Sequence, residues 1–264
     1  MLKIQGVSKT FNPGTVTEKK AIDKLNLTIE DGQFVTVIGG NGAGKSTLLN
    51  LIAGVYPPDC GRIILDEKDI SLLPEHKRAS DIGRVFQDPL MGTAADMEIS
   101  ENLAFAARRG KPRTLRWGNG REEQKGYKEQ LASLGLGLEE RLNNKVGLLS
   151  GGQRQAVTLL MASLQKPKLL LLDEHTAALD PLTAKKVLDL TEKIVGENQL
   201  TTLMITHNMK DAIRLGNRLI MMYDGRIIFD VSGAEKQKLT VEDLHKKFKE
   251  AAGEEFADDR AVLV

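Results

Sequence analysis

The stretch Gly39-Gly-Asn-Gly-Ala-Gly-Lys-Ser-Thr47 has the residue types and the spacing of a loop that binds phosphate groups. Its glycines permit the positive φ angles that aim successive backbone N–H groups at one anion. The pattern G-x-x-x-x-G-K-[ST] is specific when a strand precedes it and a helix follows it. The alternative is a flexible glycine turn that binds nothing. The residues expected to contact phosphate are Gly39, Asn41, Gly42, Gly44, Lys45, Ser46 and Thr47.

Two side chains of this stretch could act directly on a polyphosphate. Lys45 would place a positive charge on the β- and γ-phosphates, and Ser46 would give a hydroxyl oxygen to Mg²⁺. Magnesium takes few protein oxygens and keeps water and phosphate oxygens as its other ligands. We therefore expect one carboxylate from elsewhere in the chain to hold the water shell of the metal.

A pair of carboxylates, Asp173 and Glu174, follows the apolar run Leu169–Leu172. Such a run is typical of a parallel strand that is buried on both faces. Because open α/β sheets bind ligands at the carboxyl ends of their strands, Asp173 is the candidate for the metal. Glu174 would act as general base or orient the attacking water. The alternative is a strand that simply ends in two solvated carboxylates.

The segment Leu148-Leu-Ser-Gly-Gly-Gln-Arg-Gln155 has the features of a second anion site, although nothing near it in the chain supplies an anion. Ser150 and Gln153 have the spacing of a capping box, in which each side chain accepts a backbone N–H at a helix start. Such a start carries the positive end of the helix dipole. Gly151 and Gly152 would let a ligand approach the backbone.

Gln87 and His207 each follow a strand-like apolar stretch, so both are expected at the same edge of a sheet as Asp173. A single glutamine or histidine is more often structural than functional, and the sequence pattern around these two residues does not decide between the alternatives.

Short strands alternating with helices must position these residues. The N-terminal third predicts strands over 3–11, 25–30 and 34–38, and the Asp31-Gly32 pair between the last two predicts a hairpin. A helix is expected from Gly44 to Ala53, ended by Gly54 and then Pro57-Pro58. The phosphate loop thus lies between a strand and a helix, as its pattern requires.

The rest of the chain predicts further strands and a mainly helical lobe. From about residue 90 to 148 the composition is helical around a loop at 110–121. The basic segment 108–116 overlaps this loop and is expected to be a solvated loop. A second hairpin over 219–229 turns at Asp224-Gly225. The other expected elements are strands 62–65, up to 87, 168–172 and 201–205, helices 98–109, 125–134, 152–165 and 182–195, and a charged helix with a polar tail over 240–264.

The composition describes an ordinary globular protein. The 264 residues are 41% hydrophobic and 28% charged, with a formal net charge of +1, which argues against a dedicated nucleic-acid binder. Cys60 is the single cysteine and cannot form an internal disulfide, so a reducing, intracellular compartment is expected. No apolar run approaches the roughly 18 residues of a membrane-spanning helix.

The phosphate loop, the LLSGGQRQ segment and the LLLLDE segment occur in this order, and together they resemble the ATP-binding subunit of an ABC transporter. The resemblance covers about residues 2–230. It implies an α/β fold: a P-loop NTPase core with a mainly parallel sheet, an N-terminal antiparallel β subdomain and a helical signature subdomain. It further implies an ATPase domain over 1–230, with the helical subdomain inserted at about 90–155, and a C-terminal helix and tail over 231–264.

The resemblance also implies roles for single residues. Phe11 would stack on adenine, Gln87 would link the metal and the water to the membrane partner, and His207 would contact the γ-phosphate. Asp180 would lie at a subunit contact. Two subunits would pair head to tail, so that Ser150, Gly151, Gly152 and Gln153 of one chain close over the ATP held by Lys45 of the other.

The family resemblance implies ATP and Mg²⁺ as cofactors, and a set of protein partners. The partners would be a second copy of this chain, a separate membrane permease and a solute-binding protein, with no nucleic acid. The chain would lie at the cytoplasmic face of the membrane as a peripheral subunit. The alternative is a non-transport ABC ATPase that acts as a nucleotide-gated clamp in protein or nucleic-acid assembly.

Two departures from the family pattern concern mechanism and substrate. His175 stands where the family usually has proline after the catalytic glutamate, and a histidine there could titrate near neutrality and modulate the proton affinity of Glu174. A neutral substitution is the alternative. The segment 143–148 lacks the Thr-Glu element of many exporters, which favours an importer. The stretches at 92–102 and 173–180 are similar to importers of amino-acid-like solutes, including aromatic ones.

Overall fold

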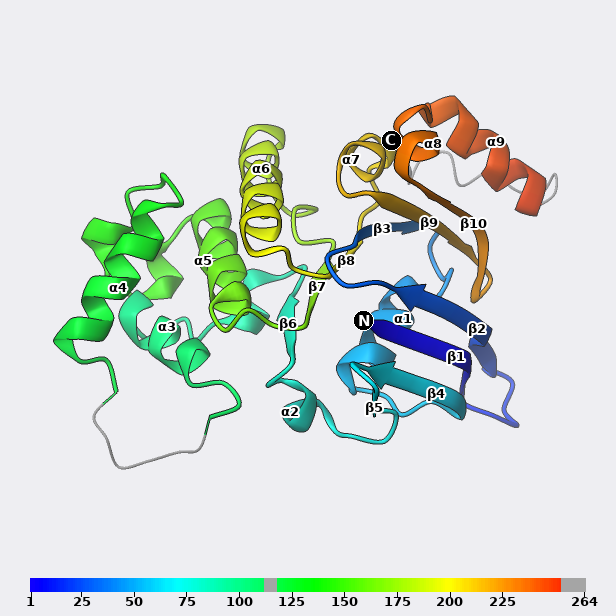
Figure 1. Cartoon of the computed structure of the whole chain (residues 1–264), viewed down its shortest axis with the longest axis horizontal. Helices are drawn as coiled ribbons and strands as arrows, with labels where there is room; N and C mark the ends of the chain where they lie inside the picture. The colour runs from blue at the N-terminus through cyan, green and yellow to red at the C-terminus, as the bar shows by residue number, and fades with distance from the viewer. Residues whose placement is uncertain (112–117, 253–264) are drawn as a thin grey trace. The chain divides into compact units, whose positions relative to one another are not determined.

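The computed structural model describes residues 1–111 and 118–252, which divide into two compact units. Unit 1 comprises Met1–Arg78 and Leu200–Val264, and unit 2 comprises Ala79–Gln199. Part of the basic segment expected as a loop, residues 112–117, and the expected polar tail, 253–264, lie outside the described residues. Figure 1 shows the elements of both units.

An antiparallel sheet forms the N-terminal part of unit 1 (Figure 1), as the family resemblance implied. Its strands lie in the order β2-β1-β4-β5. Along β2, buried apolar side chains alternate with exposed ones from Lys24 to Ile29, and β1 begins with buried and less buried residues in alternation, as expected for a sheet with one covered face. The bounds are β1 Leu2–Phe11, β2 Lys19–Ile29, β4 Cys60–Leu65 and β5 Lys68–Asp69.

The second sheet of unit 1 has the strand order β10-β9-β3-β8. Strand β3 pairs in parallel with both β8 and β9, and β10 pairs antiparallel with β9. Every residue of β3 and β8 is buried, because helices or strands cover parallel strands on both faces. The bounds are β3 Phe34–Gly39, β8 Thr202–Ile205, β9 Arg218–Tyr223 and β10 Arg226–Ser232.

One of the two predicted hairpins is confirmed and the other is wrong. Asp224 and Gly225 both have positive φ (44° and 71°) and join β9 to β10 as expected. The turn at Asp31-Gly32 exists, with Gln33 N–H donating to Glu30 O at 3.1 Å. It does not make a hairpin, because β2 pairs with β1 whereas β3 pairs with β8 and β9. The turn carries the chain from one sheet to the next.

Helix α1 (Lys45–Ala53) directly follows β3 and the phosphate loop, and Gly54 ends it in the left-handed conformation with φ 88°. Arg78 of the short helix α2 (Glu75–Arg78) places a buried cation at the carboxyl end of α1. Its Nη1 donates to Leu51 O at 2.7 Å and to Ile52 O at 2.8 Å. Burial lowers the pKa of Arg78 to about 10, so the guanidinium stays charged at neutral pH. This positive charge interacts favourably with the negative end of the α1 dipole.

The last two helices of unit 1, α8 and α9, pack against helix α7 and strands β9 and β10 (Figure 1). The bounds are α7 Met209–Arg214, α8 Gly233–Gln237 and α9 Val241–Ala252. Leu244 and Phe248 of α9 are buried in one cluster with Met209 and Ala212 of α7. Lys236 of α8 is also buried, and its ammonium donates to Leu215 O and Gly216 O just beyond α7. The expected charged C-terminal helix is therefore part of the core of unit 1.

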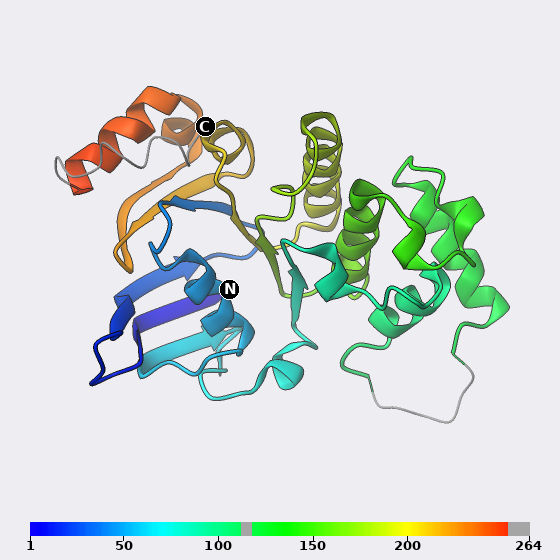
Figure 2. The ribbon, with the colours of Figure 1, turned by 180° about the vertical axis from the view of Figure 1, so that it is seen from behind.

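Unit 2 combines a parallel pair of strands with a group of helices. Strand β6 (Ile82–Val85) pairs in parallel with β7 (Leu169–Asp173). Helices α3, α4 and α5 lie together, which is clear from behind in Figure 2, and α6 packs on α5. Their bounds are α3 Ile99–Ala107, α4 Arg121–Ala132, α5 Gly151–Ser163 and α6 Pro181–Asn198. The four predicted helices are thus confirmed, with α4 beginning four residues earlier than expected.

None of the helices within 1–111 and 118–252 is both long enough and apolar enough to cross a membrane. The parallel pairs, the antiparallel N-terminal sheet and the helical group agree with the predicted α/β class. The positions that matter for chemistry are the carboxyl ends of β3, β6, β7 and β8, where the predicted site residues occur.

Candidate functional site

The phosphate loop of unit 1 has the backbone that its glycines predict. Gly42 and Gly44 adopt positive φ angles of 77° and 97°, which side chains rarely tolerate. Gly39 has a different reason to lack a side chain: a Cβ there would lie 2.5 Å from Met222 O on the neighbouring strand. A loop of this shape aims successive N–H groups inward, as anion binding requires.

Lys45 begins α1 and is only 5% exposed. Its Nζ donates to Gly39 O at 2.6 Å and to Gly40 O at 3.1 Å, so the ammonium lies within the loop. Asn41, Gly42 and Ser46 are exposed, and Thr47 is half-buried. The first N–H groups of α1 have no partner within the helix. The loop therefore offers a charge, backbone donors and a hydroxyl at one helix start.

His207 leaves the same sheet edge as the phosphate loop. Val37 of β3 is opposite Ile205 of β8 in a parallel register, so both strands end toward this edge. Thr206 N–H continues the ladder to Val37 O at 3.2 Å. Asn208 then caps α7 by accepting from Lys210 N and Asp211 N, which fixes the half-buried His207 between a strand and a helix.

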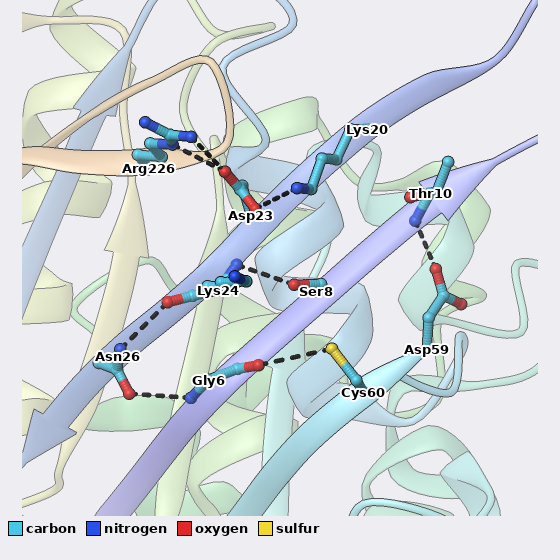
Figure 3. A network of polar contacts seen from close by, with 10 residues as sticks. All are labelled: Gly6, Ser8, Thr10, Lys20, Asp23, Lys24, Asn26, Asp59, Cys60 and Arg226. Atoms are coloured by element: carbon cyan, nitrogen blue, oxygen red, sulfur yellow. Dashed lines mark hydrogen bonds and ion pairs between the residues drawn. The ribbon is translucent and has the colours of Figure 1, made fainter.

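Phe11 ends β1 and contacts Tyr56 edge to face, with ring centroids 5.2 Å apart. Asp59 holds this end of the strand by accepting from Thr10 N at 2.6 Å (Figure 3) and from Lys9 Nζ at 2.7 Å. The ring is half-buried. Lys9 Nζ also lies over the ring, 5.9 Å from its centroid. A half-buried aromatic ring at this place is compatible with the stacking role implied by the family resemblance.

In unit 2, Asp173 ends β7 and lies beside a cation that sequence reasoning missed. Arg84 Nη2 of β6 is 3.5 Å from Asp173 Oδ2, and its guanidinium carbon lies 4.5 Å from the ring centroid of Phe86. The side chains of Arg84 and Asp173 are 13% and 16% exposed, so this pair is shielded more than a surface pair. Arg84 has no sequence signal beyond its place on the strand that leads to Gln87.

Gln87 and Glu174 leave one edge of the β6–β7 pair. Val85 is opposite Leu172 in a parallel register, and each candidate residue comes two positions later. Gln87 is exposed, whereas Glu174 is half-buried and has a positive φ of 46°. This backbone conformation is uncommon for a non-glycine residue and occurs often at functional sites. The structure thus brings Gln87, Asp173 and Glu174 together within unit 2.

The side chain of His175 is buried in the core of unit 2. It is 1% exposed, and its Nε2 lies 3.0 Å from Thr191 Oγ1. Because the Thr191 hydroxyl donates to Val187 O at 2.8 Å, it must accept from Nε2–H. Nδ1 is buried and has no hydrogen-bond partner among the described residues. The ring is therefore the neutral tautomer with hydrogen on Nε2.

Burial lowers the pKa of His175 to about 4. The expectation that this histidine could titrate near neutrality is therefore wrong, because desolvation disfavours the imidazolium. A charge on His175 cannot modulate Glu174 at neutral pH. The residue fills space against α6 in place of the usual proline.

The capping box at the start of α5 is confirmed. Gln153 N–H donates to Ser150 Oγ at 3.3 Å, and Ser150 N–H donates to Gln153 Oε1 at 3.2 Å. Ser150 and Gly151 are exposed, so this helix start faces outward. Gly152 is buried, and a Cβ there would collide with the Thr183 side chain of α6. One glycine of the pair thus serves helix packing, which the sequence did not indicate.

Two further residues of α5 hold the loops around it. Arg154 donates to Val146 O, Gly147 O and Leu149 O at 3.0 to 3.3 Å, which fixes the segment before Ser150. Gln155 is buried, and its Nε2 donates to Phe86 O at 3.2 Å. This bond connects α5 to the residue immediately before Gln87. Neither role could be predicted, because each depends on which loop the helix meets.

Asp180 caps α6, with Oδ1 accepting from Thr183 N at 3.0 Å. Hydrogen bonds from Thr183 lower the pKa of this exposed carboxyl group. Capping explains the residue locally, and the exposed position is compatible with the subunit contact that the resemblance implied.

The donor types suit Mg²⁺ without a dense metal cluster. Within the described ranges, no three His, Cys, Asp or Glu side chains gather to hold a metal ion. Magnesium does not require such a group, since one or two protein oxygens with water and phosphate complete its shell. The exposed Ser46 hydroxyl and the half-buried Asp173 carboxylate are donors of the preferred kind.

Comparison with known proteins places these features in one family. Residues 22–177 match the family described as ABC transporter. The tyrosine transport ATP-binding protein of Clostridioides difficile (strain R20291) is 48% identical over 252 residues, which cover 95% of this chain and 100% of that protein. The energy-coupling factor transporter ATP-binding protein EcfA2 of Clostridium acetobutylicum is 35% identical over 232 residues, covering 86% and 78%.

Solved structures of similar fold are ATP-binding cassettes. The dimeric, ADP- and phosphate-bound cassette MJ0796 matches with a TM-score of 0.75 at 31% identity, covering 88% of this chain and 98% of that one. The ADP conformation of the ABC transporter cassette MJ1267 matches with a TM-score of 0.78 at 28% identity, covering 96% and 99%.

Proposed function

The chain belongs to the ABC transporter family and is an ATPase, and we propose that it drives solute import through a separate membrane permease. The observation that carries the proposal is the arrangement at the strand ends: the phosphate loop and His207 share one edge in unit 1, and Gln87, Asp173 and Glu174 share one edge in unit 2. We also propose that residues 1–230 form the ATPase domain, with a helical subdomain at about 90–155.

The nucleotide is bound by residues of unit 1. Phe11 stacks on adenine, and the loop from Gly39 to Thr47 surrounds the phosphates with its N–H groups and with Lys45. His207 contacts the γ-phosphate. The buried ammonium of Lys45 and the exposed start of α1 support these roles. Backbone donors that are already positioned cost little reorganisation when the phosphate arrives.

Hydrolysis depends on residues of unit 2. Glu174 accepts the proton of the attacking water, and Gln87 orients that water and contacts the metal. Ser46 and Asp173 would hold Mg²⁺. When bound, this ion would supply positive charge to the phosphate oxygens. The uncommon backbone conformation of Glu174 supports its role, because residues with positive φ occur often at functional sites.

ATP joins two copies of the chain head to tail. Ser150, Gly151, Gly152 and Gln153 of one copy cover the γ-phosphate that is bound by the other. The outward-facing helix start at Ser150 supports this arrangement, because it offers backbone N–H groups and a helix dipole to an anion. Hydrolysis then removes the shared phosphate and lets the dimer open.

The transported solute is amino-acid-like, with aromatic amino acids as the first candidates. The 48% identical relative, matched over 95% of this chain, is named for tyrosine transport. The complete system includes the permease and a solute-binding protein, and the chain is a peripheral subunit at the cytoplasmic face of the membrane.

Two variants test the ATPase cycle. Glu174→Gln should reduce turnover by at least about 100-fold, the usual effect of losing a general base, while it keeps ATP binding and traps a dimer visible by light scattering. Ser150→Arg should prevent the dimer without weakening ATP binding to the monomer. A strict monomer of Glu174→Gln at saturating ATP and Mg²⁺ would contradict the proposed cycle, and loss of ATP binding in Ser150→Arg would contradict the assigned geometry.

A further inference from the structure

We infer that Lys19 is a nucleotide-binding residue, which places a second cation at the phosphate loop and contacts a phosphate oxygen of the bound nucleotide. The inference rests on the proposed ATP site. It concerns a residue outside the motif that marks the loop, because Lys19 begins β2 and lies more than twenty positions before Lys45 in the chain.

Lys19 lies against the loop at Gly42. A Cβ built on Gly42 would be 2.9 Å from Lys19 Nζ. Apart from Gly42 and its two chain neighbours, no described residue other than Lys19 would place a heavy atom within 4 Å of it. The ammonium therefore lies beside the exposed middle of the phosphate loop, whose shape suits an anion. Both residues belong to unit 1. Gly42 has positive φ, so this glycine is required by the loop and also makes room for the lysine.

The neighbouring lysine behaves differently and shows what an ordinary surface lysine does here. Lys20 forms an ion pair with Asp23, and Arg226 binds the same carboxylate (Figure 3). The Lys19 side chain, by contrast, has no hydrogen bond or ion pair with any residue in the described ranges. Its positive charge is thus directed at the phosphate loop without a carboxylate to neutralise it.

The strand register places Lys19 between the two ends of a nucleotide. Phe11 on β1 is directly opposite Lys19 on β2 in the antiparallel pair. Phe11 is the proposed adenine contact, and Gly42 belongs to the proposed phosphate contact. A nucleotide that reaches from one to the other passes Lys19, whose flexible stem and three donors suit a phosphate oxygen.

The test measures nucleotide affinity by titration calorimetry on the full chain. Lys19→Met should weaken ATP and ADP binding roughly tenfold, the effect of one charge-assisted contact. The loss should shrink at about 0.5 M salt, because salt screens the lost attraction. Lys19→Arg should retain most of the affinity. Lys20→Met is the matched control and should bind as the wild type does.

Other outcomes separate this inference from the proposed function. If the wild type binds ATP, Lys45→Ala abolishes binding and Lys19→Met changes nothing, the role of Lys19 is overturned and the ATP site stands. If the wild type does not bind ATP, the proposed function itself fails. Thermal unfolding without nucleotide should be the same for Lys19→Met and wild type. A large drop in the thermal unfolding midpoint of Lys19→Met would mean that its loss of affinity comes from a damaged fold, and it would overturn the inference.

Discussion

Asp173 is contacted by Arg84, and the proposed metal would have to share the carboxylate with this cation. A guanidinium 3.5 Å away directs the carboxylate, and it also repels a divalent ion nearby. We expect Arg84→Met to lower the Mg²⁺ concentration for half-maximal ATP hydrolysis by about threefold to tenfold, since one unit of positive charge leaves the site. The maximal rate should fall, because Asp173 loses a partner that fixes its orientation.

The control for Arg84→Met is Lys168→Met, at the other end of β7. Lys168 also pairs with an aspartate, since its Nζ is 3.4 Å from Asp81 Oδ1, but it is 48% exposed. Its removal should leave the Mg²⁺ requirement unchanged. A Mg²⁺ titration in which Arg84→Met requires more metal than wild type would contradict the electrostatic argument.

His175 gives the protein a pH dependence of stability that can be measured. Its pKa falls from 6.5 to about 4 on folding. The unfolded chain therefore binds the proton more readily, and stability is fully present above about pH 6.5 and is lost as pH falls toward 4. The loss amounts to at most about 3 kcal/mol. In His175→Leu the free energy of urea unfolding should change less between pH 7 and 4.5, and equal slopes for both proteins would contradict the prediction.

At the residue scale, the sequence indicates residues that belong to contiguous patterns and misses those defined by contacts. Lys45, Ser150 and Asp173 stand in motifs with their own local chemistry. Arg84 and Lys19 gain their places only because a strand brings them beside a motif from elsewhere in the chain. His175 is a similar case, since its burial against Thr191 decides its pKa.

The C-terminal helix α9 is a part of the fold to which the sequence pattern assigned no role. Its residues Leu244 and Phe248 are 0% and 2% exposed and pack with Met209 of α7, which begins two residues after His207. We expect Phe248→Ala to lower the free energy of unfolding by about 3 kcal/mol, the typical effect of removing a buried aromatic ring. Hydrogen exchange should also accelerate in α7, because this helix loses a face of its packing.

Lys247→Ala is the matched change on the other side of α9. Lys247 is 46% exposed and forms an exposed ion pair with Glu250 one turn later, so its loss should cost little. If Phe248→Ala unfolds at the same urea concentration as Lys247→Ala, α9 does not contribute to the core of unit 1.

At the element scale, local signals placed the turns and the longer helices correctly, but they missed the short helices α7 and α8 and could not assign strands to sheets. The pair Asp31-Gly32 makes a real turn, yet Gly32 N–H donates to Thr201 Oγ1, some 169 positions away. The partner of a strand depends on such distant contacts. The hairpin prediction at Asp224-Gly225 was correct because the two strands it joins pair in one sheet. There the local pattern and the tertiary pairing agree.

The whole molecule is organised by an insertion: the chain leaves unit 1 after Arg78 and returns to it at Leu200. The sequence indicates part of this arrangement, through the helical composition that begins near residue 90. It could not predict that β6 and β7 would belong to the same unit as the helices. The apolar run of β7 resembles those of β3 and β8, and the four residues of β6 carry no signal of their own for either unit.

The proposed permease should bind to apolar side chains of unit 2 that are exposed in the chain alone. Phe105 of α3 is 67% exposed, and Met91, four residues after Gln87, is 70% exposed. Large apolar residues at the surface are favoured anchors in interfaces. We expect Phe105→Glu to reduce recovery of a polytopic membrane protein when the tagged chain is purified from detergent-solubilised membranes of its source. ATP hydrolysis by the isolated chain should not change.

Leu72→Glu is the control, because Leu72 is 82% exposed but belongs to unit 1. It adds the same charge at an exposed apolar position outside the expected interface, so the permease should still be recovered with it. If Phe105→Glu and Met91→Glu both recover the permease as well as wild type does, the interface lies elsewhere. If the wild type itself is recovered only with cytosolic proteins or nucleic acid, the assignment as an ATPase would remain, but the proposed role in transport would be contradicted.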